Sequence, residues 1–341
     1  MAKGFSIIVC CYNSAALLPE TLSRLSKLIV PAEMAVELIV VDNCSTDQTA
    51  SAAGVLWQTY GQPFPLEIVS ENKPGLSYAR MRGIAASRYD FMLFCDDDNW
   101  LDPGYLTAAV PLLEKHPGVG MLGGLGLPRY QSIPSYWSSD FYIYGSGPQA
   151  SVNGPVKTLH GAGVILRRQT MARLISAGFS FMLSDRKGDS LASGGDFELC
   201  LAVTMAGYQL WYSDTLTFSH FIGPERLTHA YSKRFIKESA PAINVLDVYH
   251  HVLAGGKYPK ISFLLKQAKF MAHHSRRMLY AAWLSYKYRD NEKIVFLERF
   301  HFRYHLRRLE CIPENLLAYG KIMRRITRVK AQLEERPVPA T

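Results

Sequence analysis

The stretch FMLFCDDDNWLDP, residues 91–103, decides how the rest of the chain is interpreted. Its apolar start is typical of a buried strand, and three adjacent carboxylates, Asp96, Asp97 and Asp98, follow at once. Adjacent carboxylates repel one another and are costly to bury, so they need a cation, strong hydrogen-bond donors or open water. A divalent metal such as Mg2+ or Mn2+ takes oxygen ligands and commonly shares its coordination sphere with substrate phosphates. The cluster therefore indicates a metal-assisted nucleotide-diphosphate site, unless it is only a solvated acidic turn.

Apolar runs alternate with helix-favouring segments in the first part of the chain. The apolar runs predict strands at residues 5–11, 36–41, 66–69 and 91–95. The segments between them predict helices at residues 15–28 and 75–87, with an alanine-rich helix after Thr49. Runs that are apolar on both faces are typical of parallel strands covered by helices. The alternation therefore predicts an α/β fold built on a mostly parallel sheet.

Polar residues follow each of these expected strands. Tyr12 and Asn13 follow the first strand, Asp42 follows the second, Asn72 lies just beyond the third, and the aspartates 96–98 follow the fourth. The carboxyl ends of parallel strands lie along one edge of a sheet, and ligands of open α/β sheets bind there. Four polar loops at one edge favour a binding site over a solvated turn.

The middle of the chain has a different composition. Residues 123–155 are rich in glycine, proline, serine and aromatic residues, which predicts loops and irregular strands. Aromatic rings there could carry a sugar ring, although core filling explains any one of them as well. Residues 159–168 predict a strand whose glycines permit close approach of backbone or ligand. Two further short strands are expected at 208–212 and 216–218.

Asp196 and His220 are candidate functional residues in the second half of the chain. Asp196 lies at the start of an expected helix, where a carboxylate is electrostatically favoured. It is therefore either a catalytic residue or only a helix cap. His220 follows an expected strand and is either a metal ligand or a structural residue. Arg80 and Arg226 are placed to contact phosphate or to form structural ion pairs.

Five segments resemble the family 2 glycosyltransferases of the GT-A fold. They are the opening strand to Tyr12-Asn13, VVDNCSTDQT at 40–49, NKPGLSYARMRG at 72–83, FCDDDNWLDP at 94–103 with the acid motif Asp96–Asp98, and GGDFELCLAVTMAGYQLWY at 194–212. The resemblance covers roughly residues 4–230 in a matching order and spacing. It implies inverting transfer of a sugar from a nucleoside-diphosphate sugar to an acceptor hydroxyl.

The resemblance also implies roles for single residues. Asp42 would contact the nucleotide base, and a metal (Mn2+ or Mg2+) would bind Asp96, Asp98 and His220, with Asp98 as the direct ligand. Asp196 matches the catalytic base of the family, but the glutamate that usually precedes this base is replaced by Gly195. The residues expected to bind the nucleotide and donor are Tyr12, Asn13, Asp42, Asn72, Arg80, Asp96, Asp97 and Arg226.

The net charge of +9 is concentrated at the C-terminal end. Residues 257–341 carry 19 Lys and Arg against 7 Asp and Glu, a net charge of +12, whereas residues 1–256 carry 19 against 22, a net charge of −3. A mildly acidic body argues against nucleic acid as a partner. The sequence of residues 257–341 predicts cationic helices. It lacks the apolar run of about 20 residues that a membrane span needs. Such helices can lie on an anionic membrane surface, stay solvated or contact another subunit.

We expect two regions. Residues 1–230 would form a GT-A glycosyltransferase domain, with a nucleotide-binding half at 1–122 and an acceptor and catalytic half at 123–230. Residues 231–341 would form a helical, cationic C-terminal region. The start of the chain lacks the pattern of a secretory signal, so we expect a cytoplasmic protein, peripheral on the cytoplasmic membrane face.

The expected function is sugar transfer onto a saccharide or glycolipid acceptor, in the assembly of a surface polysaccharide or glycolipid. Two other functions compete with it. Nucleotidyl transfer to a sugar phosphate would favour a glycine-rich basic signature near the first strand, and residues 10–14 (CCYNS) are not one. A non-catalytic sugar-nucleotide-binding or scaffold protein is supported only by the missing glutamate before Asp196. A Rossmann dehydrogenase is disfavoured because no G-x-G-x-x-G follows the first strand.

Overall fold

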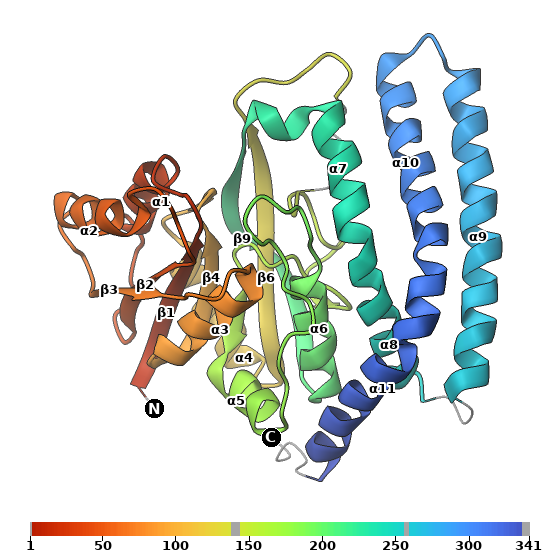
Figure 1. The fold of residues 1–341 in the computed structure, drawn as a ribbon. Coiled ribbons are helices and arrows are strands. Elements are labelled where there is room, and N and C mark those ends of the chain that lie inside the picture. The colour runs from red at the N-terminus through yellow and green to blue at the C-terminus, as the bar shows by residue number, and fades with distance from the viewer. Residues whose placement is uncertain (1, 138–143, 256–258, 336–341) are drawn as a thin grey trace.

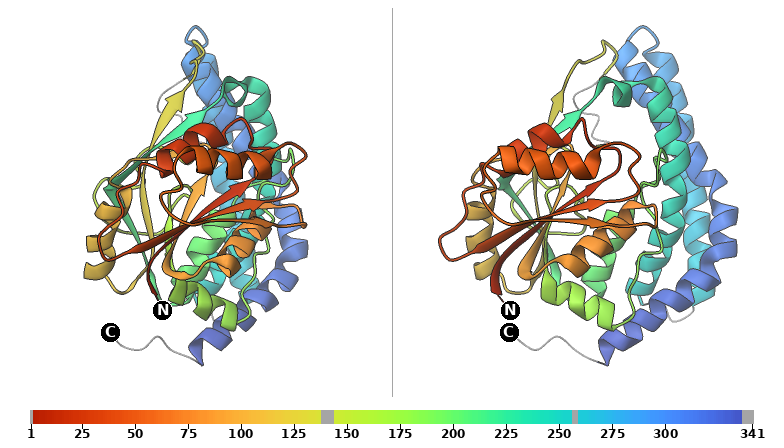
Figure 2. Two further views of the ribbon diagram at one scale, coloured as in Figure 1. Left: turned by 90° about the vertical axis from the view of Figure 1, so that its left-hand side faces the viewer. Right: turned by 60° about the vertical axis from the view of Figure 1, so that its left-hand side comes forward.

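A nine-stranded sheet with helices on both faces forms the body of the molecule, and further helices cover one side (Figures 1 and 2). The computed structural model describes residues 2–137, 144–255 and 259–335. The strands are β1 (Ala2–Cys11), β2 (Ala35–Asp42), β3 (Leu66–Ser70), β4 (Tyr89–Asp96), β5 (Asn99–Leu101), β6 (Val119–Tyr130), β7 (Gly154–Val156), β8 (Ile165–Arg167) and β9 (Gln209–Ile222). The helices of the body are α1 (Leu18–Leu25), α2 (Thr49–Thr59), α3 (Leu76–Ala86), α4 (Tyr105–Lys115), α5 (Arg168–Ser176) and α6 (Gly195–Met205).

The sheet has the strand order β3-β2-β1-β4-β8-β6-β9-β5, and β7 pairs with β9. Its N-terminal part, β3-β2-β1-β4, is parallel, which confirms the expected α/β architecture. Beyond β4 the sheet is mixed, because β8 runs antiparallel to both β4 and β6 while β6 and β9 are parallel. Cys11 pairs with Asp42 and Cys10 with Asp96, so the polar loops after β1, β2 and β4 lie side by side.

The alternation of β1 divides the core between the two faces of the sheet. Phe5, Ile7 and Val9 face the core beneath α1, α2 and α4. Ile8 faces the other core, which includes residues of α3, α5 and α6. Burial on both faces explains why this strand is apolar at every position from 7 to 11.

Three of the expected strand regions differ from the structure, and of the strand predicted at residues 159–168 only β8, at Ile165–Arg167, is extended. Residues 119–130 form the long regular strand β6, whereas loops and irregular strands were predicted from residue 123 onwards, because glycines there let β6 approach β9 closely. A side chain at Gly124 would overlap the carbonyl oxygen of Leu216. The two short strands expected at 208–218 are one continuous strand, β9, so His220 lies within a strand rather than after it. Residues 138–143 of the predicted loop lie outside the described residues.

The C-terminal region is helical, as predicted. A 3-10 turn (η1, Pro224–Leu227) leads into α7 (His229–Ser239), η2 (Ala240–Ala242), α8 (Ile243–Leu253), α9 (Pro259–Lys287), α10 (Glu292–Glu310) and α11 (Ile312–Glu334). Helix α8 packs between α6 and α11, α10 packs on α7, and α9 and α10 form a hairpin at the outer side (Figure 1). His274 and His305 join the hairpin through their Nδ1 atoms, 2.8 Å apart. None of the helices within the described ranges combines the length and apolar character needed to cross a bilayer.

Candidate active site

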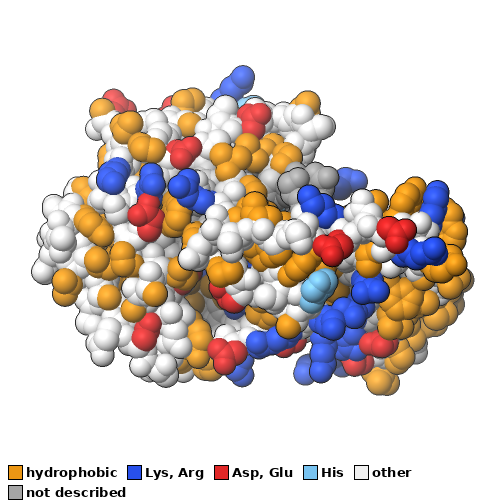
Figure 3. Space-filling view, turned by 90° about the horizontal axis from the view of Figure 1, so that it is seen from above, with side chains coloured by type: hydrophobic (Ala, Val, Ile, Leu, Met, Phe, Trp, Pro, Cys, Tyr) orange, Lys and Arg blue, Asp and Glu red, His pale blue; other side chains and the backbone are white. Residues whose placement is uncertain are grey.

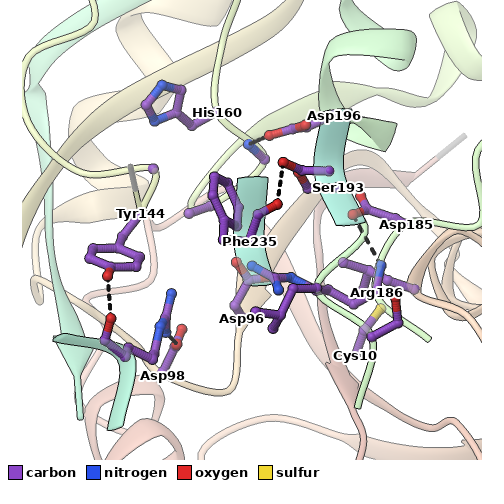
Figure 4. Close-up of a pocket in the computed structure, with 18 of the residues that line it drawn as sticks. Cys10, Asp96, Asp98, Tyr144, His160, Asp185, Arg186, Ser193, Asp196 and Phe235 are labelled. Atoms are coloured by element: carbon purple, nitrogen blue, oxygen red, sulfur yellow. Dashed lines mark hydrogen bonds and ion pairs between the residues drawn. The ribbon is translucent and has the colours of Figure 1, made fainter. Parts of the chain in front are cut away.

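A cavity of about 910 Å³ opens beyond the carboxyl ends of β1 and β4. Its lining includes the acid motif, the first turn of α6, the loop at residues 185–193, and side chains of α7 and α10. The volume suits a nucleotide sugar, since ligand pockets commonly measure about 300–1,000 Å³. Asp98 and Asp196 lie on different sides of this cavity, and Phe235 projects between them (Figure 4).

Asp98 is the most strongly bonded carboxylate of the acid motif. Its Oδ2 accepts a hydrogen bond from Nη1 of Arg226 at 2.7 Å and lies 3.3 Å from Nε2 of His220. Burial alone would raise the pKa of the Asp98 carboxyl, but His220 and Arg226 outweigh burial and hold it well below its usual range. Tyr144 fixes this cluster, because its hydroxyl donates to the backbone oxygen of Arg226 and its ring lies 4.9 Å from the guanidinium. Asp98 therefore stays ionised at neutral pH.

Asp96 and Asp97 carry less compensation. Burial raises the pKa of Asp97 to about 7, and the charge of Asp98 adds to the rise. The hydroxyl of Ser14 donates a hydrogen bond to Oδ2 of Asp97, which lowers this pKa but does not outweigh burial. Burial also raises the pKa of Asp96 despite the nearby Arg80 guanidinium. Asp96 and Asp97 are therefore less fully compensated by positive charge than Asp98, which favours an added cation beside them.

Asp196 stands in the first turn of α6. The helix begins after Gly194, whose φ of 119° is open to glycine alone among common residues. Oδ2 of Asp196 accepts from the backbone N–H of Gly161 at 3.1 Å, and Oδ1 accepts from the N–H of Phe197 at 2.9 Å. These bonds orient a half-buried carboxylate on the cavity wall, where it can accept a proton.

Arg80 lies buried among three acids. Its Nη1 is 3.3 Å from Oδ2 of Asp185, and both side chains are 6% exposed. Burial would lower the pKa of this guanidinium, but Asp185, Asp96 and Asp196 together raise it. Arg80 thus lines the cavity and forms a structural ion pair at the same time. Arg82, on the same helix, is exposed.

The predicted donor-binding residues separate into two groups. Tyr12 lines the cavity with Arg80, Arg226 and the acid motif. Asn13 and Asp42 lie outside its lining and shape the adjoining loop, since Asn13 Oδ1 accepts from the N–H of Thr46 at 2.7 Å and Asp42 Oδ1 from the N–H of Ser45 at 3.1 Å. Asn72 is exposed, also outside the lining. The roles of these three residues in nucleotide binding stay predictions.

Sequence reasoning missed several residues of the cavity. Asp185 sits in a loop that carries no motif. Tyr144 belongs to the aromatic stretch at residues 123–155, but its contact with Arg226 was not predicted. The C-terminal helices contribute an aromatic wall, defined here as Tyr231, Phe235, Phe300 and Tyr304. The only sequence signal for this wall was the aromatic content of α7 and α10.

The acid motif and His220 offer donor atoms for a metal ion. Among the described residues, no group of three or more His, Cys, Asp and Glu converges as in a preformed metal site. Asp96, Asp98 and His220 nevertheless line one cavity, and Asp98 already contacts His220. Such oxygen and nitrogen donors fit an ion that takes its remaining ligands from a diphosphate, as Mg2+ commonly does.

This molecule has a mixed α/β sheet with acidic residues at the carboxyl ends of its strands. That arrangement places it in the class of nucleotide-sugar transferases with the GT-A fold. Residues 6–174 match the family model described as "Glycosyl transferase family 2", and this part of the chain belongs to that family. Over 133 residues it is 31% identical to the poly(ribitol-phosphate) beta-N-acetylglucosaminyltransferase TarS of Staphylococcus aureus, a match that covers 37% of this chain and 22% of TarS. Over 177 residues it is 24% identical to the poly-beta-1,6-N-acetyl-D-glucosamine synthase of Staphylococcus epidermidis, covering 51% of this chain and 37% of the synthase.

Solved structures support the fold over nearly the whole chain. The S. aureus TarS 1–349 structure in complex with UDP-GlcNAc aligns with a TM-score of 0.51 and 18% identity, covering 99% of this chain and 93% of TarS 1–349. The mannosyltransferase PcManGT of Pyrobaculum calidifontis, in complex with GDP-Man and Mn2+, aligns with a TM-score of 0.53 and 21% identity, covering 97% and 84%. At these identities the likeness establishes the fold, and the predicted GT-A fold is confirmed.

Proposed function

We propose that this chain is a metal-dependent inverting glycosyltransferase that moves a sugar from a nucleoside-diphosphate sugar to an acceptor hydroxyl. The observation that carries the proposal is the division of acids within one cavity, with Asp96–Asp98 at the end of β4 and Asp196 at the start of α6. The named activities of TarS and of the synthase support a role in surface polysaccharide or glycolipid assembly.

The two groups of acids would do different work. Asp196 would take the proton from the acceptor hydroxyl as the oxygen attacks the anomeric carbon, and the nucleoside diphosphate would leave on the opposite face of the sugar. Arg226 stands where its guanidinium could turn from Asp98 toward the diphosphate. Asp96, Asp98 and His220 would hold the metal ion, which when bound neutralises charge on the diphosphate.

The direct test measures release of free nucleoside diphosphate from UDP- and GDP-sugars, with and without saccharide or glycolipid acceptors. Each reaction is run with Mn2+, with Mg2+ and with excess chelator. Acceptor-dependent release that the chelator removes would support the proposal. Nucleotide-sugar binding without release under every condition would instead support a scaffold role, and undiminished turnover in chelator would contradict metal dependence.

The aromatic wall is the proposed platform for a saccharide acceptor, because sugar rings pack their C–H faces on aromatic rings. Substituting Tyr304, which is 37% exposed, with alanine should raise the acceptor KM about tenfold and leave the donor KM nearly unchanged. Initial rates with varied acceptor and donor measure both constants. Tyr288→Ala, 39% exposed, beyond the end of α9 and outside the cavity lining, is the matched control. An unchanged acceptor KM in Tyr304→Ala would remove the ring from the acceptor site.

The outer side of the C-terminal region is the proposed membrane-facing surface. Helix α9 exposes large apolar and aromatic side chains: Ile261, Leu264, Leu265, Met271, Leu279, Tyr280, Trp283 and Tyr286. Lys269, Arg276, Arg277 and Lys287 are exposed on the same helix. The view in Figure 3 shows hydrophobic and basic side chains gathered at this end of the molecule. Apolar rings beside cations suit the interface of an anionic leaflet, at the cytoplasmic face of a membrane.

Substituting Leu279 and Trp283 with serine should weaken binding to vesicles of phosphatidylserine and phosphatidylcholine at least about tenfold, because both side chains would leave the apolar region. Co-flotation of the whole chain with vesicles measures the bound fraction. Val152→Ser, at another exposed apolar position, should float like the unsubstituted protein. Equal flotation of the α9 variant would exclude this surface, and flotation insensitive to added salt would exclude the electrostatic part.

A further inference from the structure

Gly195 stands where the resemblance leads one to expect an acid before the catalytic base, and the structure places another acid in the same space. A Cβ atom built on Gly195 would lie 2.6 Å from Oδ2 of Asp185. The carboxylate of Asp185 therefore occupies the volume that a side chain at residue 195 would take. It arrives there from a loop ten residues earlier in the chain.

Asp185 is bonded on both oxygens. Oδ2 accepts from the backbone N–H of Gly195 at 3.2 Å, and Nη1 of Arg80 lies 3.3 Å away. Oδ1 accepts from the N–H of Arg186 at 3.1 Å. The residue has a φ of 58°, an uncommon conformation that aspartate and asparagine tolerate better than most side chains. The first turn of α6, which carries Asp196, is thus tied to the buried guanidinium of Arg80.

Helix α3 fixes the loop that carries Asp185. The backbone N–H of Leu76 donates to the carbonyl oxygen of Arg186 at 2.8 Å, and the hydroxyl of Ser77 donates to the carbonyl oxygen of Leu183 at 2.6 Å. Arg80 lies one turn further along the same helix. A side chain on Gly161 would touch the Arg80 guanidinium, and the Gly161 N–H is the donor that orients Asp196. A continuous chain of contacts therefore runs from Asp185 through Arg80 and Gly161 to Asp196.

We propose that Asp185 is a positioning residue, which supplies from its loop the carboxylate that the chain lacks at residue 195. Its first task is to anchor the N-terminus of α6, so that Asp196 faces the acceptor. Its second task is to share the charge of Arg80, which also lies within electrostatic reach of Asp96 and Asp196. Without Asp185, Arg80 would turn toward the remaining acids, and a base paired with a guanidinium accepts a proton less readily. This inference rests on the proposed function, because it assigns Asp196 as the base.

Moving the carboxylate back to residue 195 tests the inference. Asp185→Asn keeps the shape of the side chain and tolerates the positive φ. It should lower kcat about a hundredfold and leave the donor KM within about threefold of the original value, because it displaces the base and not the donor. Gly195→Asp alone should lower kcat similarly, because its side chain would overlap Asp185. The double variant Asp185→Gly/Gly195→Asp should recover at least tenfold over either single variant. Asp214→Asn, an exposed acid outside the cavity lining, is the control.

Three outcomes would overturn the inference: an unchanged kcat in Asp185→Asn, a folded double variant no faster than the slower single variant, or a donor KM that rises as much as kcat falls. Thermal unfolding of each variant shows whether it is folded. If the unsubstituted protein transfers no sugar, the proposed function fails and the anchoring is tested separately. Unfolding of Asp185→Asn, Arg80→Met and their double variant should then give losses in Tm that are less than additive. Additive losses would show that the two side chains are not coupled.

Discussion

Replacing Asp196 with asparagine should lower kcat for sugar transfer by about 10²- to 10⁴-fold, the range that a positioned general base contributes. The amide has the shape of the carboxylate, and its oxygen can still accept from the N–H of Gly161, although the bond from the N–H of Phe197 is lost. The first turn of α6 should therefore move little. What the variant loses is the ability to take a proton from the acceptor. Binding of the donor, held at the other side of the cavity, should change little.

Initial rates of transfer and calorimetric titration with nucleoside diphosphate separate these two effects. The expected pattern is a large fall in kcat with a nearly constant dissociation constant for the nucleotide. Asp214→Asn should retain both properties, since Asp214 is exposed and outside the cavity lining. An Asp196→Asn variant within about tenfold of the original kcat would rule out Asp196 as the base, because a lost general base costs at least about a hundredfold.

The position of the site could be predicted from the sequence because it depends on short-range pattern. Apolar runs of a few residues define β1, β2 and β4, and parallel pairing then places the residues after them at one edge. The observed pairs Cys11 with Asp42 and Cys10 with Asp96 follow that rule. The contact of Asp98 with His220 crosses 122 residues, and only the family resemblance indicated it.

What escaped prediction depends on long-range packing. The glycines from residue 123 onwards suggested loops and irregular strands, yet residues 119–130 form one long strand, in which positions such as Gly124 have no room for a side chain beside β9. Asp185 fills the space beside Gly195 because hydrogen bonds to α3 fix its loop, and those partners are more than 100 residues away. The docking of α7 and α10 brings Phe235 and Phe300 to the cavity. No local period in the sequence specifies any of these arrangements.

Replacing Asp98 with asparagine should nearly abolish transfer and also destabilise the fold, for two separable reasons. The variant removes the carboxylate proposed as the direct metal ligand. It also leaves the partly buried guanidinium of Arg226 facing a neutral amide, and breaking one partner of a buried ion pair costs about 3 kcal/mol of unfolding free energy. A loss of activity alone would therefore not distinguish a damaged fold from a missing ligand.

The double variant Asp98→Asn/Arg226→Met makes that distinction when it is compared with Arg226→Met alone, because Arg226 is itself a proposed contact of the diphosphate. Removing both partners of a buried pair is often nearly neutral for stability, so its unfolding free energy should return most of the way to the original value. Transfer should stay low, and Mn2+ should bind weakly to the complex with nucleoside diphosphate. Asp102→Asn, from the same acidic stretch but exposed and outside the cavity lining, should keep activity and metal affinity. Recovery of metal-dependent transfer together with stability would show that Asp98 serves the fold through Arg226 and is not the metal ligand.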